Sequence, residues 1–227
     1  MGRFLSLDSP TMVFLTRVAD LMLLNIIVLF FCLPIITIGP AICAMHYVLL
    51  KMVRGEEGYL LKPFMKSFKY NFKKAMIAWV IILVFIIIFA VDLQIINNSG
   101  LEFAYWLRVA LLAVGVIATM VLLYVFPLLA RFENTVRATF KNALYISILH
   151  LPKTILMFIV CVAPILIVVF NLGLLPLLIL LGISGPGYIC ALLYSKTFKR
   201  FEPEEEAEID ADSWTVSLED EVKESLS

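Results

Sequence analysis

The sequence is short of charged residues, and this scarcity excludes most classes of soluble protein. Only 16% of the 227 residues are charged and 62% are apolar, whereas a soluble domain carries about 25% charged residues. Between Leu21 and Leu50 there is no Asp, Glu, Lys or Arg at all. A chain of this composition is an integral membrane protein.

Residues that support catalysis or bind metals are also scarce. The two histidines, His46 and His150, are far apart, and no Ser-His-Asp set, H-E-x-x-H motif or phosphate-binding glycine loop is present. We therefore expect a non-enzyme with no cofactor and no metal site. The cysteines lack C-x-x-C or zinc-ligand spacing and lie in apolar runs, which predicts small buried side chains without a disulfide framework: Cys32, Cys43, Cys161 and Cys190.

The net charge of zero hides an uneven distribution. From Glu202 onward there are eleven acidic residues and one basic residue, which leaves seventeen basic and seven acidic residues in the rest. This predicts a transmembrane domain over residues 1–200 and an acidic, largely disordered tail over 201–227. One interpretation of the tail is an electrostatic latch over basic residues 62–74, and a merely solvated tail is the favoured alternative. The basic surface faces lipid headgroups, so no nucleic-acid partner is expected.

The apolar runs predict an all-α, polytopic bundle of six transmembrane helices, because about 20 residues cross a bilayer. The second helix is short, so five spans plus a re-entrant or half helix is the alternative. The final charge-free block holds two crossings that turn at Asn171. The expected segments are Thr11–Leu33, Pro40–Val53, Ala75–Val91, Phe103–Ala130 and the two crossings within Thr154–Ser195.

The placement of lysine and arginine predicts the orientation of the chain. Basic residues are concentrated in segments 51–74, 131–153 and 196–200, whereas segment 92–108 holds one basic and two acidic residues. Short loops rich in lysine and arginine stay in the cytoplasm. We therefore expect a multi-pass protein of the inner cell membrane with a cytoplasmic C-terminus and, with six spans, a cytoplasmic N-terminus.

Two Gly-Pro stretches interrupt the apolar runs. In the first, LPIITIGPAICA at residues 33–44, Pro34 lacks a backbone donor and ends a helix. The second, residues 182–199, places Gly185 and Pro186 before another Ile-Cys-Ala. Discontinuous helices of this kind flank substrate sites in transporters, but glycine also lets helices approach closely. We favour the second interpretation.

Arg17 and Asp20 are three residues apart in the first predicted helix and therefore share a face. Ionisable residues within a membrane are candidates for a transport site. Both lie toward one end of the apolar run, where they can pair or reach the interface. We favour a structural pair over a transport site.

The segment KPFMKSFKYNFKK, residues 62–74, has two distinct faces at helical spacing. This pattern predicts a basic interfacial helix that lies on the anionic inner leaflet and continues into the next span. The alternative is a docking surface for a cytoplasmic partner. The aromatic face holds Phe64, Phe68 and Phe72, and the opposite face holds Lys62, Lys66, Lys69 and Lys73.

Residues 131–154 loosely resemble the coupling loop of importer-type ABC permeases. Glu133 and Leu151-Pro152 have about the right separation, but Asn134 and Thr135 replace the alanines of that loop and Thr139 replaces its glycine. An ordinary amphipathic connector is the favoured interpretation.

A group of residues in the first part of the chain resembles the YesL family of bacterial membrane proteins, also known as the DUF624 domain. The group comprises Leu24-Asn25, Leu33-Pro34, Thr37, Gly39-Pro40, Ala41 and Ala44, followed by Phe68, Asn71 and Phe72. Members come mainly from Gram-positive bacteria and are often encoded beside carbohydrate ABC importers and glycoside hydrolases. The family has no established biochemical activity.

This resemblance implies a non-enzymatic accessory or regulatory protein of the inner membrane, associated with carbohydrate ABC-type uptake. Its expected partners are the lipid bilayer and the permease or ATPase subunits of an importer, and a homo-oligomer is possible. The resemblance identifies no catalytic residue. The alternative is a self-sufficient small-solute carrier or permease-like subunit.

Overall fold

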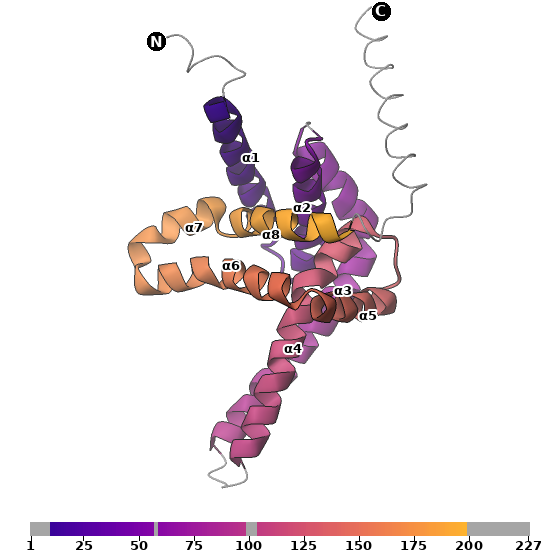
Figure 1. Ribbon diagram of the computed structural model, residues 1–227, viewed down its shortest axis with the longest axis vertical. Coiled ribbons are helices and arrows are strands. Elements are labelled where there is room, and N and C mark those ends of the chain that lie inside the picture. The colour runs from indigo at the N-terminus through magenta and orange to yellow at the C-terminus, as the bar shows by residue number, and fades with distance from the viewer. Residues whose placement is uncertain (1–9, 57–58, 99–103, 199–227) are drawn as a thin grey trace, which may run out of the picture. The chain divides into compact units, whose positions relative to one another are not determined.

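The computed structural model describes residues 10–56, 59–98 and 104–198. Within these ranges every regular element is a helix, which confirms the predicted all-α class (Figure 1). The elements are α1 (Pro10–Phe31), the 3₁₀ turn η1 (Ile35–Thr37), α2 (Ile38–Arg54), α3 (Leu61–Asn98), α4 (Ala104–Arg131), α5 (Val136–Leu149), α6 (Leu151–Phe170), the 3₁₀ turn η2 (Leu172–Leu174), α7 (Leu175–Leu181) and α8 (Ser184–Phe198).

The chain divides into two compact units, residues 1–192 and residues 193–227. The first holds α1 to α7 and the beginning of α8. In the second, the described residues are the last turns of α8, up to Phe198. The predicted acidic tail and its latch over residues 62–74 lie outside the described residues.

Five described helices are long and apolar enough to cross a membrane, and a bent pair makes a sixth if it counts as one span. The second span, Ile35–Arg54, has 20 residues because the 3₁₀ turn extends it. The interruption lies instead in the last span, where segments Leu172–Leu181 and Ser184–Phe198 meet at 54°. Length and composition therefore support the predicted five to six crossings.

The core of the first unit forms around α2. Half of the α2 span is buried, compared with at most 22% of any other unbroken candidate span. The α2 helix packs mainly against α3 and also contacts the last turns of α4. The buried side chains include Ala41, Ala44, Val48 and Leu49 of α2, Ala75 and Ala78 of α3, and Tyr124, Val125 and Leu128 of α4.

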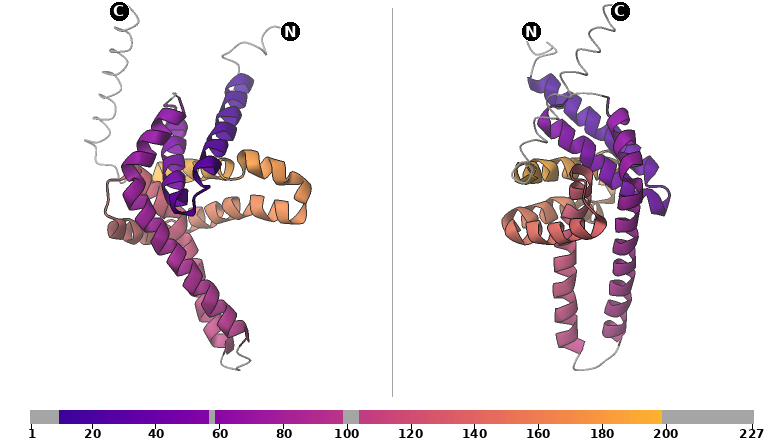
Figure 2. Two further views of the ribbon diagram at one scale, coloured as in Figure 1. Left: turned by 180° about the vertical axis from the view of Figure 1, so that it is seen from behind. Right: turned by 90° about the vertical axis from the view of Figure 1, so that its right-hand side faces the viewer.

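The helices α3 and α4 form an antiparallel hairpin (Figure 2). Beyond its contact with α2, this hairpin exposes long apolar side chains, among them Val84, Ile87 and Ile88 of α3 and Leu112 and Ile117 of α4. An exposed apolar surface of this size on uninterrupted helices is what lipid contact requires.

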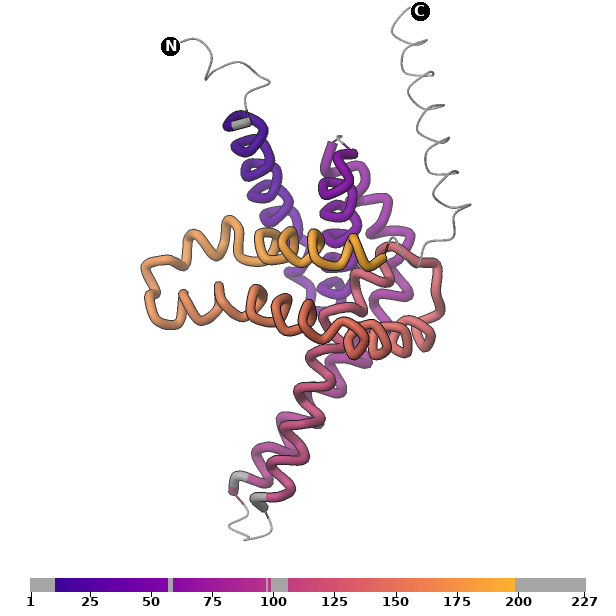
Figure 3. The backbone as a smooth tube through the Cα atoms, viewed as in Figure 1, coloured from indigo at the N-terminus to yellow at the C-terminus, as the bar shows by residue number. Residues whose placement is uncertain are grey.

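The chain turns back between α6 and α7, as the orange part of the tube in Figure 3 shows. The Asn171 side chain accepts a hydrogen bond from the Gly173 backbone N–H at 3.2 Å, which fixes η2. This confirms the turn that was predicted at Asn171. The short α7 and then α8 follow.

Candidate functional site

The first break separates α1 from α2, and side chains satisfy the carbonyl groups that it frees. Pro34 cannot donate to the α1 ladder, and the chain passes through η1 before α2 begins. The Thr37 hydroxyl donates to the carbonyl oxygens of Phe31 at 2.6 Å and Pro34 at 2.8 Å. The indole Nε1 of Trp79 in α3 donates to the Ile35 carbonyl at 2.8 Å. The carbonyl groups of Phe31, Pro34 and Ile35 at this break therefore all accept hydrogen bonds from side chains.

Gly39 lets α2 approach α3 at this break. A Cβ atom added to Gly39 would lie 2.5 Å from the Trp79 Cβ and 2.6 Å from the Ala75 carbonyl oxygen. Pro40 lies in the first turn of α2, where a backbone N–H would have no partner within the helix, so the N–H that proline lacks costs no hydrogen bond there. The Gly-Pro pair therefore starts a helix and brings it against α3 at the same place.

The second break separates α7 from α8, and Asn25 of α1 satisfies it. The Asn25 side chain is fully buried. Its amide nitrogen donates to the Ile179 carbonyl at 2.6 Å, and its oxygen accepts from the backbone N–H groups of Ile183 at 3.1 Å and Ser184 at 2.8 Å. In return, the Ser184 hydroxyl donates to the Leu21 carbonyl of α1 at 2.7 Å.

Small residues close the second break against α2. A Cβ atom on Gly187 would lie 2.9 Å from Leu49 Cδ1, so α8 also approaches α2 closely here. Gly185 and Pro186 lie in the first turn of α8, where the N–H that proline lacks would have no helical partner. The two Gly-Pro stretches thus have the same use, a helix start beside a close helix contact.

Arg17 extends this polar contact by two turns along α1. Its Nη1 donates to the Tyr188 hydroxyl of α8 at 3.1 Å. Arg17 is exposed and Asp20, three residues further on, is partly buried. A pair between Arg17 and Asp20 remains a prediction. Arg17, Leu21 and Asn25 together give α1 a line of polar contacts to α7 and α8.

The basic segment at the start of α3 has the two predicted faces. Its four lysines are exposed, and we call them the lysine ridge: Lys62, Lys66, Lys69 and Lys73. On the other face, Phe64 is fully buried. The ring of Phe31, at the end of α1, lies 5.3 Å from the Phe64 ring and 4.9 Å from the Phe68 ring, between centroids. The Phe72 ring lies 5.5 Å from the Phe68 ring, again between centroids. We call Phe64, Phe68 and Phe72 the aromatic stripe.

The segment also continues into the span without a break, as predicted. Helix α3 has 38 residues, which at a rise of 1.5 Å per residue is about 57 Å, whereas the hydrocarbon layer is about 30 Å thick. Part of the aromatic stripe is covered by the chain itself, through Phe31. The start of α3 is therefore a helix held on its own domain, with lysines on its outer face.

Segment 131–154 is tied to α3 next to the lysine ridge. The Tyr70 hydroxyl of α3 donates to the Glu133 carboxylate. Thr135 then caps α5, since its side chain accepts from the Ala138 N–H at 3.3 Å. Arg137 and Lys141 on α5 are exposed. The loop that resembled a coupling loop thus forms an amphipathic helix beside the ridge.

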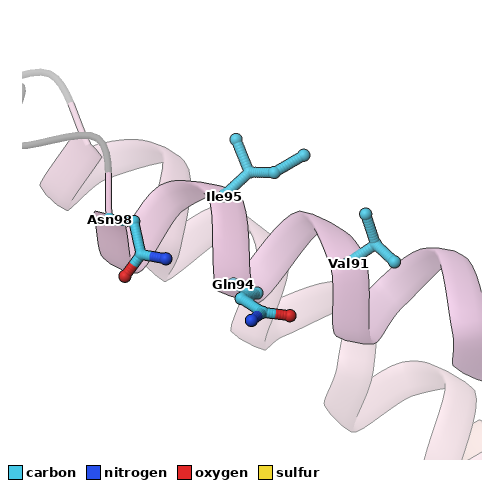
Figure 4. Close-up of a pocket in the computed structure, with 4 residues that line it drawn as sticks. All are labelled: Val91, Gln94, Ile95 and Asn98. Carbon is cyan, nitrogen blue, oxygen red and sulfur yellow. The ribbon is translucent and has the colours of Figure 1, made fainter.

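Within the described ranges, no three of His, Cys, Asp or Glu come together as they would to hold a metal ion. An open depression near the end of α3 is lined by four side chains of that one helix, Val91, Gln94, Ile95 and Asn98 (Figure 4). None of these four carries a charge or a nucleophile.

Several contacts were not found by sequence reasoning. Hydrogen bonds at the two breaks involve Trp79 and Ser184, and Phe31 covers the aromatic stripe. The Tyr70 hydroxyl donates to Glu133, which lies 63 residues further along the chain. The hydroxyl and indole groups in apolar runs were a usable signal, because each needs a partner there. Their partners lie too far along the chain for spacing to identify them.

Comparison with known proteins shows two similarities of sequence. Residues 21–93 match a family described as a protein of unknown function, DUF624. The chain is also similar to the uncharacterized protein YteU of Bacillus subtilis (strain 168), at 29% identity over 156 residues, which are 67% of this chain and 70% of that protein. No solved structure matches the chain. The matched family region contains Asn25, the first break and the lysine ridge.

Proposed function

We propose a function from the surface that the protein presents, because residues 21–93 match DUF624, a family of unknown function. The protein is a non-enzymatic accessory of the cell membrane, and its lysine ridge docks on a carbohydrate ABC-type importer. In this proposal the ridge and α5 face the cytoplasm, because both belong to the basic segments.

The observation that carries the proposal is the rigid presentation of the ridge. The four lysines lie on one face of a continuous helix, and Phe31 and the Glu133 carboxylate hold that helix at two places. A surface that is already ordered loses less entropy when a partner binds. Its positive charge favours fast association with an acidic surface.

The importer is proposed as the partner on the resemblance to the YesL family, whose members are often encoded beside carbohydrate importers. A membrane subunit that lies next to a permease needs contacts within the bilayer and at the cytoplasmic face. The exposed apolar α3–α4 hairpin and the lysine ridge offer one of each.

Purification from native membranes in a mild detergent tests this proposal. Tagged full-length protein should bring down permease or ATPase subunits of a carbohydrate importer. The double variant K66Q/K69Q should recover them up to about thirtyfold less, since two exposed ion pairs contribute about 0–2 kcal/mol together. The matched control R137Q/K141Q removes the same charge from α5 and should recover them as the wild type does.

Two results would overturn the docking function. Repeated purification without any importer subunit would remove the partner. Equal loss in K66Q/K69Q and R137Q/K141Q would show that general charge, and not the ridge, determines recovery.

A self-sufficient carrier is the second candidate, favoured by the buried Asn25 at a helix break. Against it, Asn25 already makes three hydrogen bonds to the backbone. Vesicles reconstituted with the protein and supplied with radiolabelled mono- and disaccharides decide the question. Uptake above that of protein-free vesicles, lowered by Asn25→Leu, would favour a carrier, whereas absence of uptake removes this candidate.

A further inference from the structure

Two cysteines from different helices lie in contact inside the membrane domain. Cys161 of α6 and Cys190 of α8 are 29 residues apart in the chain, and their Sγ atoms are 3.7 Å apart. The Cys190 thiol also lies 3.9 Å from the Met157 carbonyl oxygen of α6. Sequence spacing had predicted four unrelated buried thiols, so this pair is a product of the fold.

The surroundings of the pair favour chemistry that produces no charge. The whole stretch from Thr154 to Ser195 has no charged residue. Cys190 is 2% exposed, while Cys161 is partly exposed on the apolar surface of α6. A thiolate or a metal thiolate would place charge in this apolar region at high cost. A disulfide is neutral and removes two S–H groups that have few partners here.

We propose that Cys161 and Cys190 form an oxidisable dithiol site that closes to a disulfide. The oxidant is a small two-electron acceptor that reaches Cys161 from the lipid side, either hydrogen peroxide or a lipid-soluble quinone. Each thiol gives up its hydrogen and the two sulfurs form one S–S bond. Hydrogen peroxide is thereby reduced to two water molecules, or the quinone to its hydroquinone.

The geometry requires a small movement for this reaction. A disulfide has its sulfurs about 2.05 Å apart. The distance between the two Sγ atoms, now 3.7 Å, must therefore shorten by about 1.7 Å. The bond would tie α6 to α8 across α7 and the 54° bend. Oxidation would thus add a covalent link at the second break, where Asn25 and Ser184 make hydrogen bonds in the reduced protein.

The remaining cysteines supply an internal control. Cys43 is buried in α2, and Cys32 lies directly after α1. In the part of the chain that the structure describes, neither of them contacts a second thiol. Trypsin cleaves after lysine and arginine, so Cys161 and Cys190 lie together in peptide 154–196. Cys32 and Cys43 lie together in peptide 18–51.

The test uses full-length protein in native membranes. The membranes are reduced, freed of reductant and treated with hydrogen peroxide or decylubiquinone. They are then denatured in the presence of N-ethylmaleimide, which alkylates free thiols, and digested with trypsin. By mass spectrometry, peptide 154–196 should lose the mass of two hydrogen atoms and take up no maleimide. Peptide 18–51 should take up two maleimides, and in C190S the oxidised peptide 154–196 should take up one.

Three results would overturn the dithiol site. They are two maleimides on peptide 154–196 after oxidation, equal oxidation of peptide 18–51, and a disulfide that joins two separate chains. The wild-type masses alone decide between these outcomes, so the test does not depend on how well C190S folds. It needs no importer subunit, so it is independent of the proposed docking function.

Discussion

Asn25 completes the backbone of a helix break that lies more than 150 residues away in the chain. It accepts from the N–H groups of Ile183, just before α8, and Ser184, the first residue of α8, and it donates to a carbonyl group of α7. Without these bonds the broken helix would leave polar groups unsatisfied in an apolar surrounding, at about 1–3 kcal/mol for each group. A buried amide in an apolar span is therefore a structural requirement of this fold.

Replacement of Asn25 by leucine tests this requirement, because leucine has a similar volume and no polar group. We expect Asn25→Leu to lower the free energy of unfolding by about 2–4 kcal/mol. Thermal unfolding in detergent should show a lower transition temperature. Asn98→Leu, at an exposed position of α3, is the control and should unfold as the wild type does. An unchanged transition for Asn25→Leu would contradict this role.

Gly39 offers a second test at the scale of one residue. In Gly39→Ala the new methyl group would meet Trp79 and the Ala75 carbonyl at 2.5 and 2.6 Å, so we expect a loss of about 1–3 kcal/mol from overpacking. Gly185→Ala is the matched control, because its methyl group would meet Leu181 at an ordinary 3.7 Å. Chemical unfolding of the two variants compares them directly. Equal stabilities would show that α2 does not need a glycine at residue 39.

Among the helices, α3 combines two functions that sequences usually divide between separate segments. Its second part is an apolar span and its first part carries the lysine ridge, yet no break separates them. The aromatic stripe explains the continuity. Phe31 packs on Phe64 and Phe68, so the first turns of α3 are held by tertiary contact as well as by their own hydrogen bonds.

The removal of Phe31 should therefore loosen the start of α3. In Phe31→Ala we expect faster amide hydrogen exchange over residues 61–72, since each aromatic contact contributes about 0.5–1.5 kcal/mol. Phe30→Ala is the control, because Phe30 is 68% exposed and contacts Phe31 alone among the described ring pairs. Hydrogen exchange measured by mass spectrometry distinguishes the two variants. Equal exchange in both would show that α3 does not depend on Phe31.

The helices themselves were largely predictable from the sequence. The first predicted helix, Thr11–Leu33, corresponds to α1 (Pro10–Phe31), and the second, Pro40–Val53, lies within α2. These segments follow from local hydropathy and from the missing donor of Pro34, which need no tertiary information. The break between α7 and α8 was placed only roughly, around Gly185. Its position at Gly182 and Ile183 depends on Asn25, which no local pattern connects to α8.

At the scale of the whole molecule, surfaces were harder to predict than spans. The two faces of residues 62–74 followed from helical periodicity, but the cover on the aromatic face came from Phe31, in another helix. The contact of Cys161 with Cys190 likewise depends on how α6 and α8 pack. Such pairings arise from the tertiary fold, and the spacing of residues along the chain gives no measure of them.

Site-specific photo-crosslinking in native membranes tests most directly whether the lysine ridge is a docking surface. A photoreactive residue replaces Lys69 on the ridge or, as a control, Ile165, which is exposed in the apolar span α6, outside the ridge and the α3–α4 hairpin. Crosslinks from residue 69 to a permease or ATPase subunit, with none to those subunits from residue 165, are the predicted result. Crosslinks from residue 69 to lipid alone, in membranes that contain the importer, would contradict docking at the ridge.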